Sequence, residues 1–347
     1  MEVQYSAVAA KLKAMHANFL TDEDFDRLLE KTSVKDICAC LKATKGYGDV
    51  LSDIDESDVH RGAIEVKLYQ DMVNEYERLY NFLDHSKREI MQFWFMRHEL
   101  EFLKGEIRYI YTHEERKKDE ISREKFDAFF SSHTKINRDI MSKAVSLADC
   151  IEACKNTPYQ KALQRAENLN ADFFSMGMLL ETMYYDSVWK TINLKFDKSQ
   201  RELIKRHMGT KIDLLNLMWI YRGKKYFNFP SEIIFTYLLP VRYRLNEDVF
   251  KRMVTAESAD AMVSIAEGTP YSELFSGLDK GVFIEENYSR ITYKLAKDIF
   301  VNHTDSMAAV YAYLTLKEIE MKKIIMIIEG IRYNQNPESI REHIAIN

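Results

Sequence analysis

A short motif built around a threonine and a tyrosine occurs three times in this chain at a constant spacing. Each tyrosine lies 112 residues after the one before (159 − 47 and 271 − 159). The threonine stands two or three residues earlier, after an apolar helical stretch: Thr44 and Tyr47, Thr157 and Tyr159, Thr269 and Tyr271. A fixed internal period is the mark of a repeat protein. The spacing therefore predicts one helical module used three times, over residues 1–120, 121–235 and 236–347, with first helices exchanged between neighbouring modules.

The helix that closes each module carries an acidic residue followed by a basic one. The two are nine residues apart in the first and second modules and twelve apart in the third: Glu99 and Arg108, Asp213 and Arg222, Glu320 and Arg332. This second repeated feature occurs once in each predicted module, as the tyrosines do, and supports the threefold repeat.

Composition predicts an all-α fold. The chain has 347 residues but only 11 glycines and 5 prolines, too few for the turns and bulges of a β protein. Residues with high helix propensity, namely leucine, methionine, glutamate and lysine, fill the long segments. Apolar spacing predicts long helices at about 3–19, 59–84, 86–111, 168–194, 199–226, 284–301 and 303–333. We therefore expect three pseudo-repeated helical bundle modules.

Charge and cysteine usage limit the classes of partner and compartment. The net charge is −5, which argues against nucleic-acid binding by the whole chain. Residues 1–120 hold 18 basic and 25 acidic groups, whereas residues 121–235 hold 18 and 13. This imbalance is typical either of solvated helix faces or of modules that meet different partners. Cys38, Cys150 and Met262 occupy matching places before the tyrosines, so we expect packing positions and reduced thiols.

The sequence contains no arrangement typical of an active site or a cofactor site. None of the nine histidines has a glutamate three residues before it, as a di-iron helical bundle would need. Gly-rich phosphate loops, GxSxG and CxxC are absent as well. We expect no catalytic residue, no metal and no cofactor. No apolar run approaches the ~20 residues of a membrane-spanning helix, so a soluble cytoplasmic protein is expected.

The repeated residues have structural interpretations. A tyrosine after a helix most often packs and bonds a nearby backbone group, and we expect this of Tyr47, Tyr159 and Tyr271. Thr157 and Thr269 belong to the same signature. Asp213 and Arg222 are interpreted as a buried pair, an interface pair or exposed charges. A set of polar residues is predicted either to contact partners or to bond between helices: Glu99, Arg108, Asp213, Asn216, Arg222, Glu318, Glu320 and Arg332.

Several of these segments together resemble a known family. They are Tyr5 to Met15 with Phe19-Leu20-Thr21, the turn from Leu41 to Tyr47, the helix from Lys211 to Arg222, and Leu316 to Tyr333. In this order they are similar to the C subunit of the V/A-type ATP synthases, which is called the d subunit in eukaryotic vacuolar ATPases. The resemblance covers essentially the whole chain. Phe102 and Lys323 depart from it, since they stand where the other modules would carry an amide like Asn216.

The resemblance implies a pseudo-threefold funnel on the cytoplasmic face of a membrane. It further implies a non-catalytic rotor subunit that receives the central shaft, made of D- and F-type subunits, and sits on the membrane proteolipid ring. Such a subunit transmits torque during ATP-coupled transport of protons or sodium ions. The alternative is a general α-helical repeat scaffold for soluble partners. A helical-bundle metalloenzyme is a third class, disfavoured by the missing Glu-x-x-His pairs.

Overall fold

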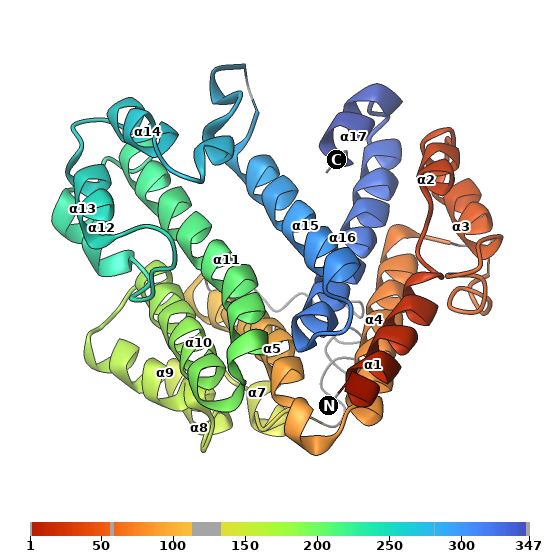
Figure 1. The fold of residues 1–347 in the computed structure, drawn as a ribbon, viewed down its shortest axis with the longest axis horizontal. Coiled ribbons are helices and arrows are strands. Elements are labelled where there is room, and N and C mark those ends of the chain that lie inside the picture. The colour runs from red at the N-terminus through yellow and green to blue at the C-terminus, as the bar shows by residue number, and fades with distance from the viewer. Residues whose placement is uncertain (1, 56–58, 113–132, 281, 345–347) are drawn as a thin grey trace. The chain divides into compact units, whose positions relative to one another are not determined.

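The structure is a computed structural model that describes residues 2–55, 59–112, 133–280 and 282–344. Within these ranges the regular elements are helices and no β-strand occurs (Figure 1). The helices before residue 113 are α1 (Glu2–His16), α2 (Asp22–Leu29), α3 (Val34–Lys42), α4 (Arg61–Phe82), η1 (His85–Lys87) and α5 (Glu89–Thr112). The prediction of an all-α protein is confirmed.

The helices after residue 132 continue the same alternation of short and long elements. They are α7 (Arg138–Met141), α8 (Leu147–Ala153), α9 (Pro158–Asn168), α10 (Phe173–Lys195), α11 (Lys198–Lys225), α12 (Ser231–Tyr237), α13 (Glu247–Thr255), α14 (Ala259–Glu267), η2 (Ser272–Phe275), η3 (Leu278–Lys280), α15 (Ile284–Asn302), α16 (Met307–Arg332) and α17 (Pro337–Ile344). The helix expected at 168–194 begins only at Phe173, because a turn with Asn170 at a φ of 45° separates it from α9.

The described residues form two compact units. Unit 1 contains residues 1–91 and 293–347, and so combines α1 to α4 with α16 and α17 from the other end of the chain. Unit 2 contains residues 92–112 and 132–292, with α7 to α14 and most of α5. The expected boundary at residues 120 and 121, and the predicted helix at 126–130, lie outside the described residues. The units follow spatial contacts, whereas the three modules follow the sequence period.

The helix before each motif tyrosine has the same local structure in its three copies. Helices α3, α8 and α14 all begin after a serine whose hydroxyl accepts the backbone N–H three residues on: Ser33, Ser146 and Ser258. All three are followed by a threonine whose hydroxyl donates to the carbonyl three residues before it: Thr44, Thr157 and Thr269, at 2.6–2.7 Å. Between the two caps, Cys38, Cys150 and Met262 are fully buried, as expected of packing positions.

Two long helices end in a similar way, which no repeat in the sequence had indicated. After α11 and α16 an asparagine takes a positive φ, 48° at Asn228 and 52° at Asn334. The next N–H then returns to a carbonyl inside the helix, Phe229 to Gly223 and Gln335 to Gly330. A short helix follows in each case, and an isoleucine from it packs against that glycine: Ile234 of α12 against Gly223, and Ile340 of α17 against Gly330. The close approach depends on the absence of a side chain at Gly223 and Gly330.

Substitution of Gly330 by alanine should displace α17 from unit 1. A Cβ atom there would lie 2.5 Å from Ile340 Cδ1, too close for packing without movement. We expect a loss of about 1–3 kcal/mol in unfolding free energy and faster hydrogen exchange in α17. Gly105→Ala on α5 is the matched control, because a Cβ atom there would have no described neighbour within 4 Å beyond its own helix backbone. The control should gain about 0.5–1 kcal/mol from helix propensity, and equal effects of the two substitutions would contradict the prediction.

Candidate functional site

The three motif tyrosines each donate a hydrogen bond to one of the three repeated acidic residues. The hydroxyl-to-carboxylate distances are 2.5 Å for Tyr47 and Glu320, 2.9 Å for Tyr159 and Glu99, and 2.9 Å for Tyr271 and Asp213. All six side chains are buried. The sequence pattern singled out both sets of residues but did not connect them, and it predicted a backbone partner for each tyrosine. Among the described contacts only Tyr159 has one as well, the carbonyl of Met96 at 3.2 Å.

The order of these contacts follows the chain in a regular way. Each of the first two joins a closing helix to the tyrosine of the next predicted module, 60 residues later for Glu99 and 58 for Asp213. The third joins residues 273 apart, because Glu320 near the end of the chain meets Tyr47 near its beginning. Glu320 and Tyr47 lie in unit 1, and the other two contacts lie in unit 2. The acidic residue of each closing helix thus accepts a hydrogen bond from the tyrosine of the next module, and the first module counts as the one after the third.

Asp213 on α11 is the most completely bonded of the three carboxylates. Besides Tyr271 it accepts backbone N–H groups from the segment before α13: Tyr243 at 3.0 Å, Arg244 at 2.8 Å and Leu245 at 3.4 Å. Burial raises the pKa of Asp213, and these four hydrogen bonds to the charged form oppose the rise. One side chain thus fixes the loop that leads into α13 and the motif turn after α14.

Glu99 on α5 has a similar environment with fewer partners. Its second oxygen accepts the Thr134 hydroxyl at 2.6 Å, so the segment before α7 is held in the same manner as the segment before α13. Burial raises the pKa of Glu99, while the hydroxyls of Thr134 and Tyr159 lower it. Leu20, just before α2, gives the corresponding donor in unit 1, since its N–H lies 2.9 Å from Glu320 Oε2.

The remaining polar residues singled out in the sequence divide into internal and exposed positions. Asn216 is buried and bonds both backbone groups of Leu239, accepting its N–H at 2.8 Å and donating to its carbonyl at 3.4 Å. Arg222 forms an ion pair with Glu285, so the interpretation that pairs Arg222 with Asp213 is wrong. Glu318 pairs with Lys322 on its own helix. Arg108 and Arg332 are exposed at the ends of α5 and α16.

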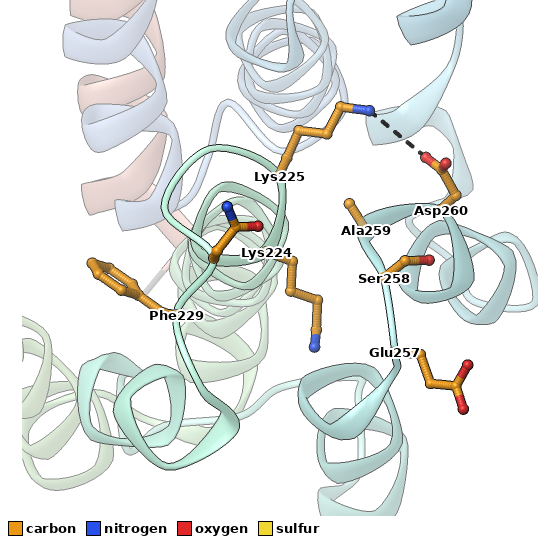
Figure 2. Close-up of a pocket in the computed structure, with 8 residues that line it drawn as sticks. Lys224, Lys225, Phe229, Glu257, Ser258, Ala259 and Asp260 are labelled. Atoms are coloured by element: carbon orange, nitrogen blue, oxygen red, sulfur yellow. Dashed lines mark ion pairs between the residues drawn. The ribbon is translucent and has the colours of Figure 1, made fainter.

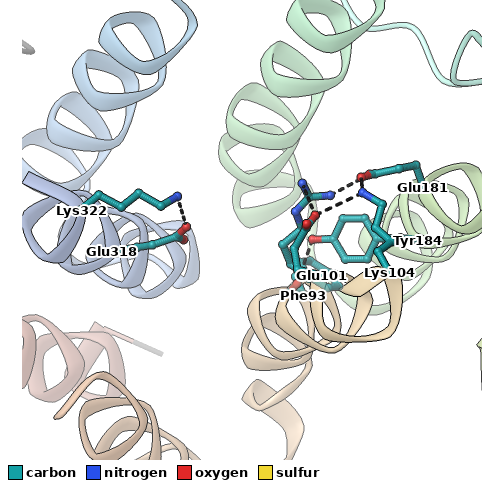
Figure 3. A network of polar contacts seen from close by, with 8 residues as sticks. Phe93, Glu101, Lys104, Glu181, Tyr184, Glu318 and Lys322 are labelled. Carbon is teal, nitrogen blue, oxygen red and sulfur yellow. Dashed lines mark hydrogen bonds and ion pairs between the residues drawn. The ribbon is translucent and has the colours of Figure 1, made fainter. Parts of the chain in front are cut away.

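An ion-pair group in unit 2 was missed by sequence reasoning. Glu181 on α10 is buried and accepts Arg97 at 2.7 Å and Lys104 at 2.6 Å, both from α5 (Figure 3). Glu101 pairs with the same two cations. Beside them the Tyr184 hydroxyl donates to the Phe93 carbonyl at 2.8 Å. No period or motif marks these residues, and only the packing of α10 on α5 brings them together.

The cavities of the described residues contain no grouping typical of catalysis. One cavity of about 370 Å³ lies in unit 2 between the end of α11 and the start of α14 (Figure 2). Lys225 and Asp260 pair across it at 3.9 Å, and Lys224 donates to the Ala256 carbonyl at 2.6 Å. Another, of about 440 Å³, lies in unit 1 and is lined by α16, α17 and Arg61 of α4.

Potential metal ligands are also not grouped in the described residues. No group of three or more histidine, cysteine, aspartate or glutamate side chains is placed to hold a metal ion among the described residues. Each helix that the structure describes is either too short or too polar to span a lipid bilayer. The polar side chains brought together here hold helices to one another.

The fold and these contacts define an all-helical protein in which repeated buried carboxylates join successive segments. The chain belongs to the ATP synthase (C/AC39) subunit family, whose sequence model matches residues 8–343. The C subunit of the A-type ATP synthase of Thermococcus kodakarensis is 24% identical over 350 residues, 98% of this chain and 90% of the relative. The C subunit of Methanococcoides burtonii is 23% identical over 99% of this chain and 94% of the relative, and that of Methanosphaera stadtmanae 21% over 96% and 86%.

Proposed function

We propose that this protein is a non-catalytic central-stalk subunit of a V/A-type rotary ATPase. In this role it links the central shaft to the membrane proteolipid ring and transmits torque for ATP-coupled transport of protons or sodium ions. The observation that carries the proposal is the family match over residues 8–343, together with relatives matched over nearly the whole chain that are C subunits of A-type ATP synthases. The shaft partners would be D- and F-type subunits, and the protein would lie peripherally on the cytoplasmic face of the membrane.

The internal contacts suit a coupling element. Torque passes through a protein only if its helices resist sliding. The tyrosine–carboxylate contacts tie the first two closing helices to a later segment and the third to a segment near the beginning of the chain. Each of these contacts is buried, where hydrogen bonds to a charged group are strong and costly to break. We propose that the three predicted modules, 1–120, 121–235 and 236–347, form a pseudo-threefold funnel through these contacts. Stiffness of this kind supports coupling and needs no active site.

Burial separates the polar residues that can contact other subunits from those that cannot. Glu99, Asp213, Asn216 and Glu320 are buried and bonded internally, so we assign them to the structure of the subunit itself. Arg108 and Arg332 are exposed at the ends of closing helices, and we propose them as contacts with the shaft or the ring. Glu318, half-buried beside Lys322, is a weaker candidate.

The proposal predicts co-purification of the motor. A tagged full-length chain, extracted from its native membranes in mild detergent, should bring down shaft, catalytic-head and proteolipid subunits, identified by mass spectrometry. Arg332→Glu should reduce their yield at least about tenfold without changing the unfolding free energy, since an exposed arginine contributes little to stability. Lys155→Glu, which replaces an exposed lysine paired with Glu152, is the matched control and should leave the yield unchanged.

One outcome would go against the rotor role, and another only against the role of Arg332. Recovery of soluble partners alone, under conditions that keep the motor intact, would favour the helical scaffold for soluble proteins. Recovery of the motor by both variants equally would retain the rotor role but remove Arg332 from the contact surface.

A further inference from the structure

A buried charged cluster in unit 1 surrounds the contact between Glu320 and Tyr47. Its centre is Lys317 on α16, whose ammonium lies 3.1 Å from Asp71 Oδ2 on α4, 3.4 Å from Glu320 Oε1 and 3.1 Å from the Tyr47 hydroxyl. The rings of Tyr47 and Phe19 lie 4.5 and 5.3 Å from the same ammonium. On the far side of the cluster, Tyr313 on α16 bonds Glu75 on α4.

The charges of this cluster do not balance. Asp71, Glu75 and Glu320 are three carboxylates, and Lys317 is the one cation among the buried members that the structure describes, all with exposed fractions of 4–8%. Arg78 reaches Glu75 at 3.6 Å, but its side chain is 60% exposed and screened by water. Lys323, three residues after Glu320 on α16, is partly buried against the rings of Phe25 and Tyr293, and its charge also attracts Glu320. Full ionisation would bury an excess of negative charge, which costs several kcal/mol unless a proton is taken up.

Two of the three carboxylates are stabilised by the ammonium. Glu320 receives three donors, the Leu20 N–H, the Tyr47 hydroxyl and the Lys317 ammonium. Burial raises the pKa of Glu320, and these three groups lower it. Asp71 receives the ammonium at its shorter distance. Both carboxylates therefore contact the ammonium directly, and Glu75 has no such contact among those described.

Glu75 is the carboxyl best placed to hold the extra proton. Among the described contacts of the buried cluster, it is bonded by a neutral hydroxyl alone, that of Tyr313. Burial raises the pKa of Glu75, although the Tyr313 bond and the charge of Lys317 lower it in part. A protonated Glu75 relieves the excess negative charge at the lowest cost in hydrogen bonds.

In unit 2 no such gathering of carboxylates around one cation is described. Around Glu181 two cations, Arg97 and Lys104, meet two carboxylates. Three residues before the repeated acid stand Met96 and Thr210, whereas Lys317 holds that place before Glu320. Among the described contacts of this kind, only the one that joins the two ends of the chain gathers three buried carboxylates around one buried ammonium. Closing so long a loop has the largest entropic cost of the three.

We infer that Glu75 is the carboxyl of this cluster that takes up a proton first as the pH falls, and that it acts as a pH-sensitive latch between α4 and α16, which closes the first and last segments into one unit. The inference does not depend on the proposed rotor role. Loss of the proton leaves three carboxylates against a single buried ammonium, so α4 and α16 separate more easily. Protonated Glu75 instead bridges to Tyr313 without added charge.

The direction of the pH dependence follows from proton binding. A carboxyl whose pKa is raised on folding binds more protons in the folded state, so its contribution is fully present below the unfolded pKa. That contribution is lost as the pH rises through the folded pKa. Once the proton has left, the unfolding equilibrium constant of unit 1 should have risen by up to about tenfold for each pH unit between the two pKa values.

Glu75→Gln tests the latch because the amide resembles a permanently protonated carboxyl. Urea unfolding of the full chain from about pH 5 to about pH 9 should lose the alkaline weakening in E75Q and keep it in the wild type. Glu77→Gln, two residues along α4, is the matched control and should behave as the wild type. The infrared C=O band of the Glu75 carboxyl, followed from acid pH upward, should bleach at a higher pH than that of an ordinary glutamate, and this late-bleaching band should be absent in E75Q and present in E77Q.

A second variant covers the case in which E75Q fails to fold. Tyr313→Phe removes the hydroxyl bonded to Glu75, so it should shift the frequency of that infrared band without abolishing it. An unchanged band in both variants, or a pH dependence of unfolding in E75Q equal to that of the wild type, would overturn the assignment to Glu75.

Discussion

Asp213→Ala is expected to destabilise unit 2 by about 3–5 kcal/mol, a large effect for one substitution, because it breaks a buried charged network. The carboxylate accepts four hydrogen bonds, and its removal leaves the Tyr271 hydroxyl and three backbone N–H groups without that partner. A buried donor that loses its acceptor costs about 1–3 kcal/mol. Urea unfolding measures the loss, and hydrogen exchange should show it first in α11 and α13.

Asp186→Ala on α10 is the matched control. Asp186 is 43% exposed and pairs with Lys190 on the same helix, so its removal should cost less than about 1 kcal/mol. Asp213→Asn separates charge from hydrogen bonding, since the amide keeps one acceptor oxygen and should lose less than alanine. Equal unfolding free energies for Asp213→Ala and Asp186→Ala would show that the network does not hold α11 to the following segments.

Lys317→Met should cost unit 1 about 3–5 kcal/mol at neutral pH. Methionine retains most of the apolar volume but removes the cation that faces Asp71 and Glu320 at 3.1 and 3.4 Å. Coulombic attraction to these carboxylates raises the pKa of Lys317 despite its burial, so the ammonium is the stable form. The loss should shrink at acid pH, where protonation relieves the uncompensated carboxylates. Thermal unfolding at two pH values measures both effects.

Lys322→Met gives the comparison on the same helix. Lys322 is 62% exposed and pairs with Glu318, so less than about 1 kcal/mol should be lost, with little dependence on pH. If Lys317→Met unfolded like Lys322→Met at every pH, the charged cluster would not be what holds the two ends of the chain together in unit 1.

Several local features were predictable because they depend on short stretches of sequence. The helix at 199–226 differs from α11 by one residue at each end, since helix spacing and caps are written in neighbouring residues. The threonine and tyrosine of each motif, and the acid of each closing helix, were found from their period alone. The matching burial of Cys38, Cys150 and Met262 followed from their equivalent places.

The contacts between these residues could not be predicted from local patterns and became clear from the packed helices. A tyrosine at 47 and a glutamate at 320 are 273 residues apart, and no local pattern indicates that the closing helix of the last module returns to the first. The group around Glu181 and the cluster around Lys317 have no sequence signature, because their members come from different helices. The helices and the repeated side chains could be read from the sequence, since propensity and periodicity act over a few residues. The tertiary structure decided their partners, because the packing of distant helices selects which buried charges must be neutralised together.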